Sequence, residues 1–77
     1  MSYVIVQFPE RREVLMDDQS QGDNVDANGL PCLLIVNAGF HTFRLGGAPN
    51  FAPPVQTVDV PEVPIITPHP VVFTRTP

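Results

Sequence analysis

The 77-residue chain contains no lysine and no tryptophan, and its only cationic side chains are four arginines. Eight carboxylates give it a formal net charge of −4 at pH 7. Binding to a nucleic-acid backbone requires several clustered cations that displace counterions, and anionic membrane surfaces attract the same kind of segment. The composition therefore predicts a protein that binds neither nucleic acid nor an anionic membrane surface.

A single cysteine, Cys32, excludes an intramolecular disulfide. It lies in the apolar run 30–36, where a cysteine usually behaves as a small buried hydrophobic side chain. Structural zinc requires four nitrogen or sulfur ligands, usually in closely spaced pairs. The chain has only three candidate ligands, Cys32, His41 and His69, so we expect no zinc site. We expect His41 to make a structural hydrogen bond, and we expect no catalytic residue and no enzyme activity.

Long apolar runs are also missing. No stretch approaches the roughly 20 residues of a membrane-spanning helix, and Met1 is not followed by the basic and apolar regions of a secretion signal. The sequence thus predicts a cytoplasmic chain by default, without membrane insertion. Apolar residues make up 43% and charged residues 16%, a balance that favours a folded chain over a disordered one.

Residues 1–77 have the alternation and turn signals of an all-β fold, which we expect to be a small antiparallel β-sandwich of six or seven short strands. The expected strands are residues 3–8, 12–17, 30–37, 40–45, 55–60 and 71–74. The turn Asn37-Ala38-Gly39 predicts that its two flanking strands form a β-hairpin. Polar residues 18–29 predict a loop, and glycine and proline in residues 46–54 predict an irregular segment in which Phe51 packs on the core.

Seven of the ten prolines lie from Pro53 onward, so residues 61–77 form a Pro-rich, extended C-terminal segment. We favour a segment that folds back on its own sheet. The alternative is strand addition to a neighbouring subunit. In that case the candidate interface residues are Ile65, Ile66, Val71, Val72 and Phe73.

Residues 4–60 also carry a family pattern. Pro9 and Glu10 precede alternating apolar residues, which lead to Asp17 and the later Gly22. The second half of the pattern consists of Gly39, His41, Phe43, Leu45, Gly47, Phe51, Val55, Val58 and Val60. This arrangement resembles a PEGA domain.

The chain departs from the PEGA signature at three positions. Arg11 and Arg12 stand where the signature has glycine and alanine, and Asp18 stands where a turn glycine is usual. The resemblance implies a prealbumin-like β-sandwich without catalytic chemistry. It also implies a surface, stalk or interaction role, commonly outside the membrane, which is the opposite of the location that the N-terminus predicts.

The acidic loop 17–29 is the candidate ion site. Its oxygen side chains alternate like the start of a calcium loop, and the candidate ligands are Asp17, Asp23, Asn24, Asp26 and Asn28. An EF-hand requires a glutamate at the twelfth position, where this chain has Ile35. The alternative is a solvated turn in which these side chains cap backbone groups.

Two functions follow from these features. The first is a non-enzymatic structural or protein-interaction β-domain that self-associates or serves as a subunit of an assembly. The alternative is a small calcium-stabilised ligand-binding domain that uses residues 17–29. No other cofactor is expected.

Overall fold

A computed structural model describes residues 1–76. Its strands are β1 (Ser2–Gln7), β2 (Glu13–Met16), β3 (Gln19–Asp23), β4 (Leu34–Val36), β5 (Gly39–Leu45), β6 (Phe51–Ala52), β7 (Gln56–Val60), β8 (His69–Val72) and β9 (Thr74–Arg75). The described residues contain no helix, and seven of the strands have three or more residues. The predicted all-β sandwich of short strands is therefore confirmed.

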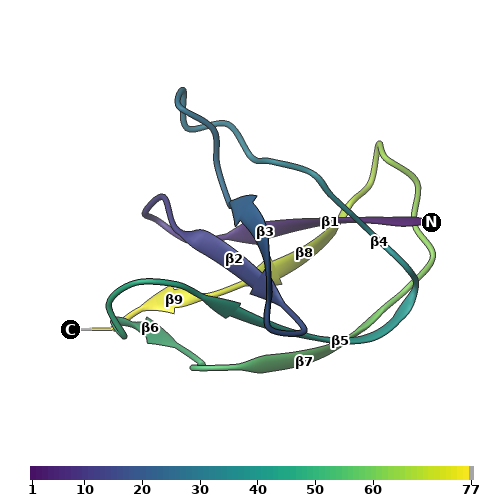
Figure 1. The fold of residues 1–77 in the computed structure, drawn as a ribbon. Coiled ribbons are helices and arrows are strands. Elements are labelled where there is room, and N and C mark those ends of the chain that lie inside the picture. Colours follow the sequence, from purple (N-terminus) through teal and green to yellow (C-terminus); the bar gives the residue numbers. More distant parts are fainter. Residues whose placement is uncertain (77) are drawn as a thin grey trace.

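The strands form two main sheets that face each other (Figure 1). One has the order β4-β1-β8 and the other the order β3-β2-β5-β7, while β6 and β9 pair in a short ribbon. We call the first the three-stranded sheet and the second the four-stranded sheet. Because each sheet buries one face against the other, every long strand alternates between inward and outward side chains.

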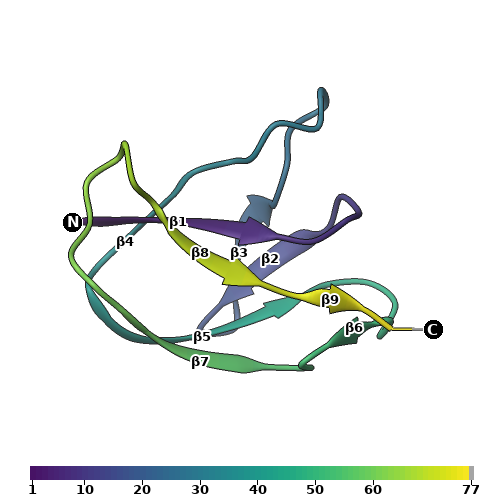
Figure 2. The ribbon, with the colours of Figure 1, turned by 180° about the vertical axis from the view of Figure 1, so that it is seen from behind.

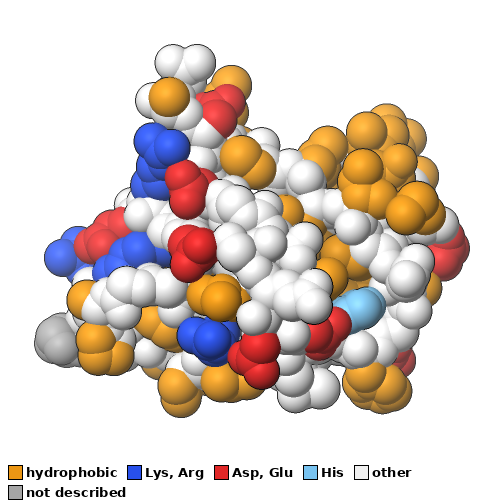
Figure 3. All heavy atoms as spheres, viewed as in Figure 1, with side chains coloured by type: hydrophobic (Ala, Val, Ile, Leu, Met, Phe, Trp, Pro, Cys, Tyr) orange, Lys and Arg blue, Asp and Glu red, His pale blue; other side chains and the backbone are white. Residues whose placement is uncertain are grey.

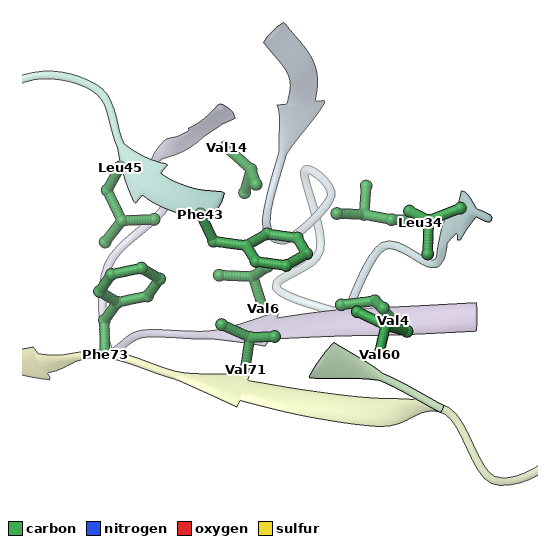
Figure 4. Packing of buried hydrophobic residues seen from close by; sticks show 10 residues of the cluster. Val4, Val6, Val14, Leu34, Phe43, Leu45, Val60, Val71 and Phe73 are labelled. Atoms are coloured by element: carbon green, nitrogen blue, oxygen red, sulfur yellow. The ribbon is translucent and has the colours of Figure 1, made fainter. Parts of the chain in front are cut away.

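The core consists of ten buried apolar side chains that come from both sheets. They are Val4, Val6, Val14, Leu34, Val36, Phe43, Leu45, Val60, Val71 and Phe73. Figure 4 shows Phe43 of β5 reaching across the sandwich toward Val6 and Val71 of the opposite sheet. Burial of such a side chain stabilises the fold by about 1.5–3 kcal/mol, so these few residues carry most of the hydrophobic stabilisation.

β1 lies at the centre of the three-stranded sheet, as its β-branched sequence predicts. It pairs with β4 antiparallel, but with β8 it pairs parallel. This parallel pair is the exception in an otherwise antiparallel fold. A parallel pair needs a long crossover connection, and here the four-stranded sheet lies within that connection.

The predicted hairpin around Ala38-Gly39 is wrong. β4 pairs with β1, whereas β5 pairs with β2 and β7, so the turn carries the chain from one sheet to the other. Gly39 has a φ of 125°, a backbone conformation that favours glycine. This crossing lets the inward faces of β4 and β5 contribute to the same core from opposite sides.

The prediction of a loop over residues 18–29 is wrong for its first part. β3 pairs with β2 through a two-residue turn, in which Asp17 and Asp18 have φ values of 52° and 65°. Positive φ at both central residues is the requirement of a type I′ hairpin turn. β3 has the sequence QSQGD, which offers no apolar residue to mark it as a strand.

The remaining strands differ from the expected ones mainly at their ends. The run 30–37 forms a strand only at β4, and Pro31 makes an isolated bridge with Val25. In the irregular stretch 46–54, Phe51 begins the short β6 and packs edge-on against Phe73, with 5.6 Å between ring centroids. That packing confirms its predicted contact with the core.

The C-terminal segment pairs within its own chain, which is the arrangement that we favoured over strand addition to a neighbouring subunit. β8 lies along β1 and β9 lies along β6, and Figure 2 shows both C-terminal strands on the side of β1. Pro77 lies outside the described residues.

Candidate interaction surface

The two sheets present chemically different outer faces. On the four-stranded sheet, the outward positions of β5 and β7 are Phe40, Thr42, Arg44, Thr57 and Asp59. Among them Phe40 is the one apolar residue, and it pairs with the charged Asp59. On the three-stranded sheet, the outward side chains are Tyr3, Ile5, Gln7, Ile35, Pro70 and Val72. Gln7 lies at the end of β1, and we call the other five residues the apolar outer face. None of the five carries a charge, whereas the outer face of the four-stranded sheet holds the charged Arg44 and Asp59.

The strand register brings the residues of the apolar outer face together. Tyr3 lies opposite Ile35 across the β1–β4 pair, and Ile5 lies opposite Pro70 across the β1–β8 pair. Directly opposite side chains in a sheet are close neighbours that contact one another. Ile35 is 56% exposed and Val72 is 50% exposed, so the two flanking strands leave much of the apolar surface in contact with solvent.

The loop of residues 61–68, which connects β7 to β8, adds further apolar surface. Ile65 and Ile66 are 52% and 83% exposed, and Figure 3 shows hydrophobic side chains gathered over this loop. The buried Ser2 anchors the loop: its hydroxyl donates to the Pro61 carbonyl at 2.5 Å and accepts from the Val63 amide at 3.2 Å. The loop is therefore fixed beside the start of β1, at one end of the apolar outer face.

Only part of the predicted interface set lies on this surface. Ile65, Ile66 and Val72 are exposed, but Val71 and Phe73 are core residues with 2% exposure each. The prediction for Val71 and Phe73 is corrected because residues 71–73 alternate across the sheet, and those two side chains point inward. Sequence reasoning missed Tyr3, Ile5 and Ile35, because the apolar runs that contain them gave no sign of which face lay outside.

Asp17 belongs to a pair with His41 and to no group of oxygen ligands. Its carboxylate lies 2.7 Å from His41 Nδ1 and accepts the Thr42 backbone amide at 2.9 Å. The other ring nitrogen, Nε2, lies 2.7 Å from the Asn37 carbonyl. Because both ring nitrogens face acceptors, the arrangement favours the imidazolium form, which donates from both.

The pKa values of this pair shift in opposite directions. The hydrogen bond to Asp17, followed by that to the Asn37 carbonyl, raises the pKa of His41 above its usual value. The hydrogen bond from His41, followed by that from the Thr42 amide, lowers the pKa of Asp17. His41 thus makes the predicted structural hydrogen bond and ties the β2–β3 turn to the β4–β5 turn.

Three of the other candidate ion ligands have protein partners of their own. Asp23 pairs with Arg11 at 2.9 Å, and Asp26 Oδ1 accepts the backbone amides of Asn28 and Leu30 at 2.8 and 3.0 Å. Asn24 is buried, and its side chain accepts from the Arg12 amide at 2.7 Å. No group of three or more histidine, cysteine, aspartate or glutamate side chains suited to a metal ion occurs among residues 1–76.

Arg12 is the most connected side chain that sequence reasoning did not identify. Its side chain is 12% exposed, and it donates to the carbonyls of Gly46 and Ala48 at 3.0 and 2.9 Å. It also pairs with Glu10 at 3.0 Å, bonds Asn50 and lies over the ring of Phe8. The hydrogen bond that Arg12 donates to Glu10 is the main reason why the pKa of Glu10 is lowered. No local pattern in the sequence distinguishes Arg12 from its exposed neighbour Arg11.

Cys32 is a half-buried free thiol, and His69 lies on β8, where it pairs with Val4 of β1. The surface formed by residues 1–76 has no pocket. In the same residues there is no helix long and apolar enough to cross a membrane. Comparison with protein-family models, with curated proteins and with solved structures finds no match.

Proposed function

We propose that this protein is a non-enzymatic interaction domain, an assembly subunit that binds another protein through the apolar outer face. The observation that supports the proposal is the contrast between the two sheets: the outward residues of the three-stranded sheet are uncharged and mostly apolar, whereas those of the four-stranded sheet include the charged Arg44 and Asp59 beside Phe40. Single exposed apolar residues are ordinary, but contiguous apolar patches on small proteins mark interaction sites.

The geometry of the face suits a protein partner. A β-sheet presents a regular surface of interdigitating side chains, and sheets stack on one another at about 10 Å. Strands β1 and β8, which carry four of the five residues, also contribute Val4, Val6 and Val71 to the core. The binding surface is therefore built on the rigid part of the fold.

Site-specific photocrosslinking tests this function. A photoreactive amino acid replaces Ile35 on the apolar outer face in one variant, and Thr57 on the polar face of β7 in the matched control. Both positions are exposed strand residues, so the two variants differ mainly in the face that they probe. Expressed in the cell that makes the protein, the position-35 variant is expected to form a covalent protein adduct, and the position-57 variant is not.

An adduct counts as binding only if the same crosslink forms again when the purified components are mixed. An adduct with a second copy of the chain and an adduct with another protein both support the function. If position 35 forms no protein adduct, or if position 57 forms the same one, the proposed function is wrong.

A further inference from the structure

We infer that the occupant of the apolar outer face is a second copy of this chain, stacked face to face about a two-fold axis. The inference rests on the proposed function and names its partner. In such an isologous contact each copy offers the same patch to the other, so the patch must be compatible with itself in both shape and charge.

The charge distribution meets this requirement. Each copy carries a net charge of −4, but the five residues of the apolar outer face bear none of it. At the end of the face where β1 begins, the Met1 amino group pairs with Glu62 at 3.0 Å. At the opposite end, Arg75 pairs with Glu10 at 3.2 Å. Both ends are thus locally neutralised, and two copies can stack without bringing unpaired like charges together.

The exposed area also fits a dimer. Ile35, Val72, Ile65 and Ile66 are each at least half exposed, and the largest apolar patch of a small protein typically measures roughly 300–600 Å². A standard stable interface buries about 800 Å² per partner. Leu33, which precedes β4 and is 43% exposed, and the backbone of β4 and β8 can supply the remainder.

The small core gives the contact a physical role. A chain of this length buries a limited share of its surface and commonly depends on an additional staple such as oligomerisation. A second copy on the apolar outer face would turn the outward side chains of β1 into a second buried layer. The three-stranded sheet would then be covered on both faces.

Sedimentation velocity on the full chain, from micromolar to millimolar concentration, tests the inference. The wild type is expected to reach twice the chain mass of 8.4 kDa. Ile35→Glu places a charge within the contact, on β4, and is expected to weaken dimerisation by about 100-fold. Thr57→Glu makes the same charge change on the polar face and is expected to leave the dimer within about threefold of wild type.

Circular dichroism establishes that each variant keeps the β fold. If Ile35→Glu does not fold, Val72→Glu on β8 tests the same contact from another strand. A wild type that stays monomeric throughout, or a folded Ile35→Glu or Val72→Glu protein that dimerises like wild type, overturns the inference. A monomeric wild type whose position-35 variant crosslinks to a different protein overturns the second copy and leaves the proposed function standing.

Discussion

His41 Nδ1 lies 2.7 Å from the Asp17 carboxylate, and this contact joins the β2–β3 turn to a residue of β5 that follows 24 positions later in the chain. The turn between β2 and β3 supplies the carboxylate, and the first part of β5 supplies the imidazole. The pair fixes the four-stranded sheet at the end where the chain crosses from one sheet to the other.

The pair predicts a stability that depends on pH. The folded-state pKa of His41 is raised above 6.5, so its contribution is fully present below that value and is lost as the pH rises through the folded pKa. The folded-state pKa of Asp17 is lowered below 3.8, so its contribution is present above that value and is lost as the pH falls through the folded pKa. Urea unfolding of the wild type is expected to give greater stability at pH 5 than at pH 8.

Two histidine variants serve as test and control. His41→Gln is expected to abolish most of the difference between pH 5 and pH 8, and His69→Gln is expected to retain it. Equal loss in both variants would show that the pH dependence comes from elsewhere.

The neighbouring residues Arg11 and Arg12 allow the stability contribution of a largely buried arginine to be compared with that of an exposed one. Arg12→Ala is expected to cost about 2 kcal/mol in the free energy of unfolding, because it leaves the Gly46 and Ala48 carbonyls without their donor. Arg11→Ala removes only an exposed pair with Asp23 and is expected to cost less than about 0.5 kcal/mol. Chemical denaturation measures the free energy of unfolding of both variants. Similar costs for the two would contradict a stabilising role for the hydrogen bonds from Arg12 to residues 46–50.

The two aspartates of the type I′ turn are expected to respond to glycine in opposite directions. Asp17→Gly loses the hydrogen bonds with His41 and Thr42 and is expected to destabilise the protein by about 1–2 kcal/mol. Asp18→Gly relieves a positive φ of 65° and loses only an exposed contact with Arg44. Its effect is expected to range from none to a gain of about 1 kcal/mol. Thermal melts of the two variants test this, and a destabilised Asp18→Gly protein would contradict the turn assignment.

Asn24 distinguishes a structural side chain from a calcium ligand. Its amide nitrogen donates to the Glu10 carbonyl at 3.0 Å, and an aspartate would set a second acceptor against that carbonyl. Asn24→Asp is therefore expected to cost about 2–3 kcal/mol, whether calcium or a chelator is present. The control Asn28→Asp changes an exposed side chain and is expected to be nearly neutral. If calcium restored the stability of Asn24→Asp, the structural role of Asn24 would be contradicted and the calcium-site hypothesis would be supported.

Strand content was predictable from the sequence, whereas strand pairing was not. Alternation at residues 55–60 and the apolar runs at residues 3–8 and 30–37 are local patterns, and each of these ranges contains a strand, although only residues 34–36 of the last run form one. The parallel pairing of β1 with β8 joins residues more than 60 positions apart, and no local signal encodes it. β3 was not predicted because it is a polar edge strand that buries little side-chain surface.

The candidate site could be predicted only in part for a similar reason. Ile65 and Ile66 were identified because they lie in the extended Pro-rich segment, which could add as a strand to a neighbouring subunit. Ile5 and Ile35 lie in apolar runs in which every residue could belong to the core. Only the register of the three-stranded sheet shows that these two side chains point outward. The resemblance to PEGA domains stays a prediction.

Hydroxyl-radical footprinting tests the apolar outer face most directly, because it reads side-chain exposure in the unmodified protein. Tyr3 and Ile35 lie on this face, and Phe40, which is 75% exposed on β5, serves as the internal reference. On going from dilute to concentrated protein, oxidation of Tyr3 and Ile35 is expected to slow several-fold relative to Phe40. If Tyr3 and Ile35 stay as reactive relative to Phe40 at high concentration as in dilute solution, a second copy does not cover this face.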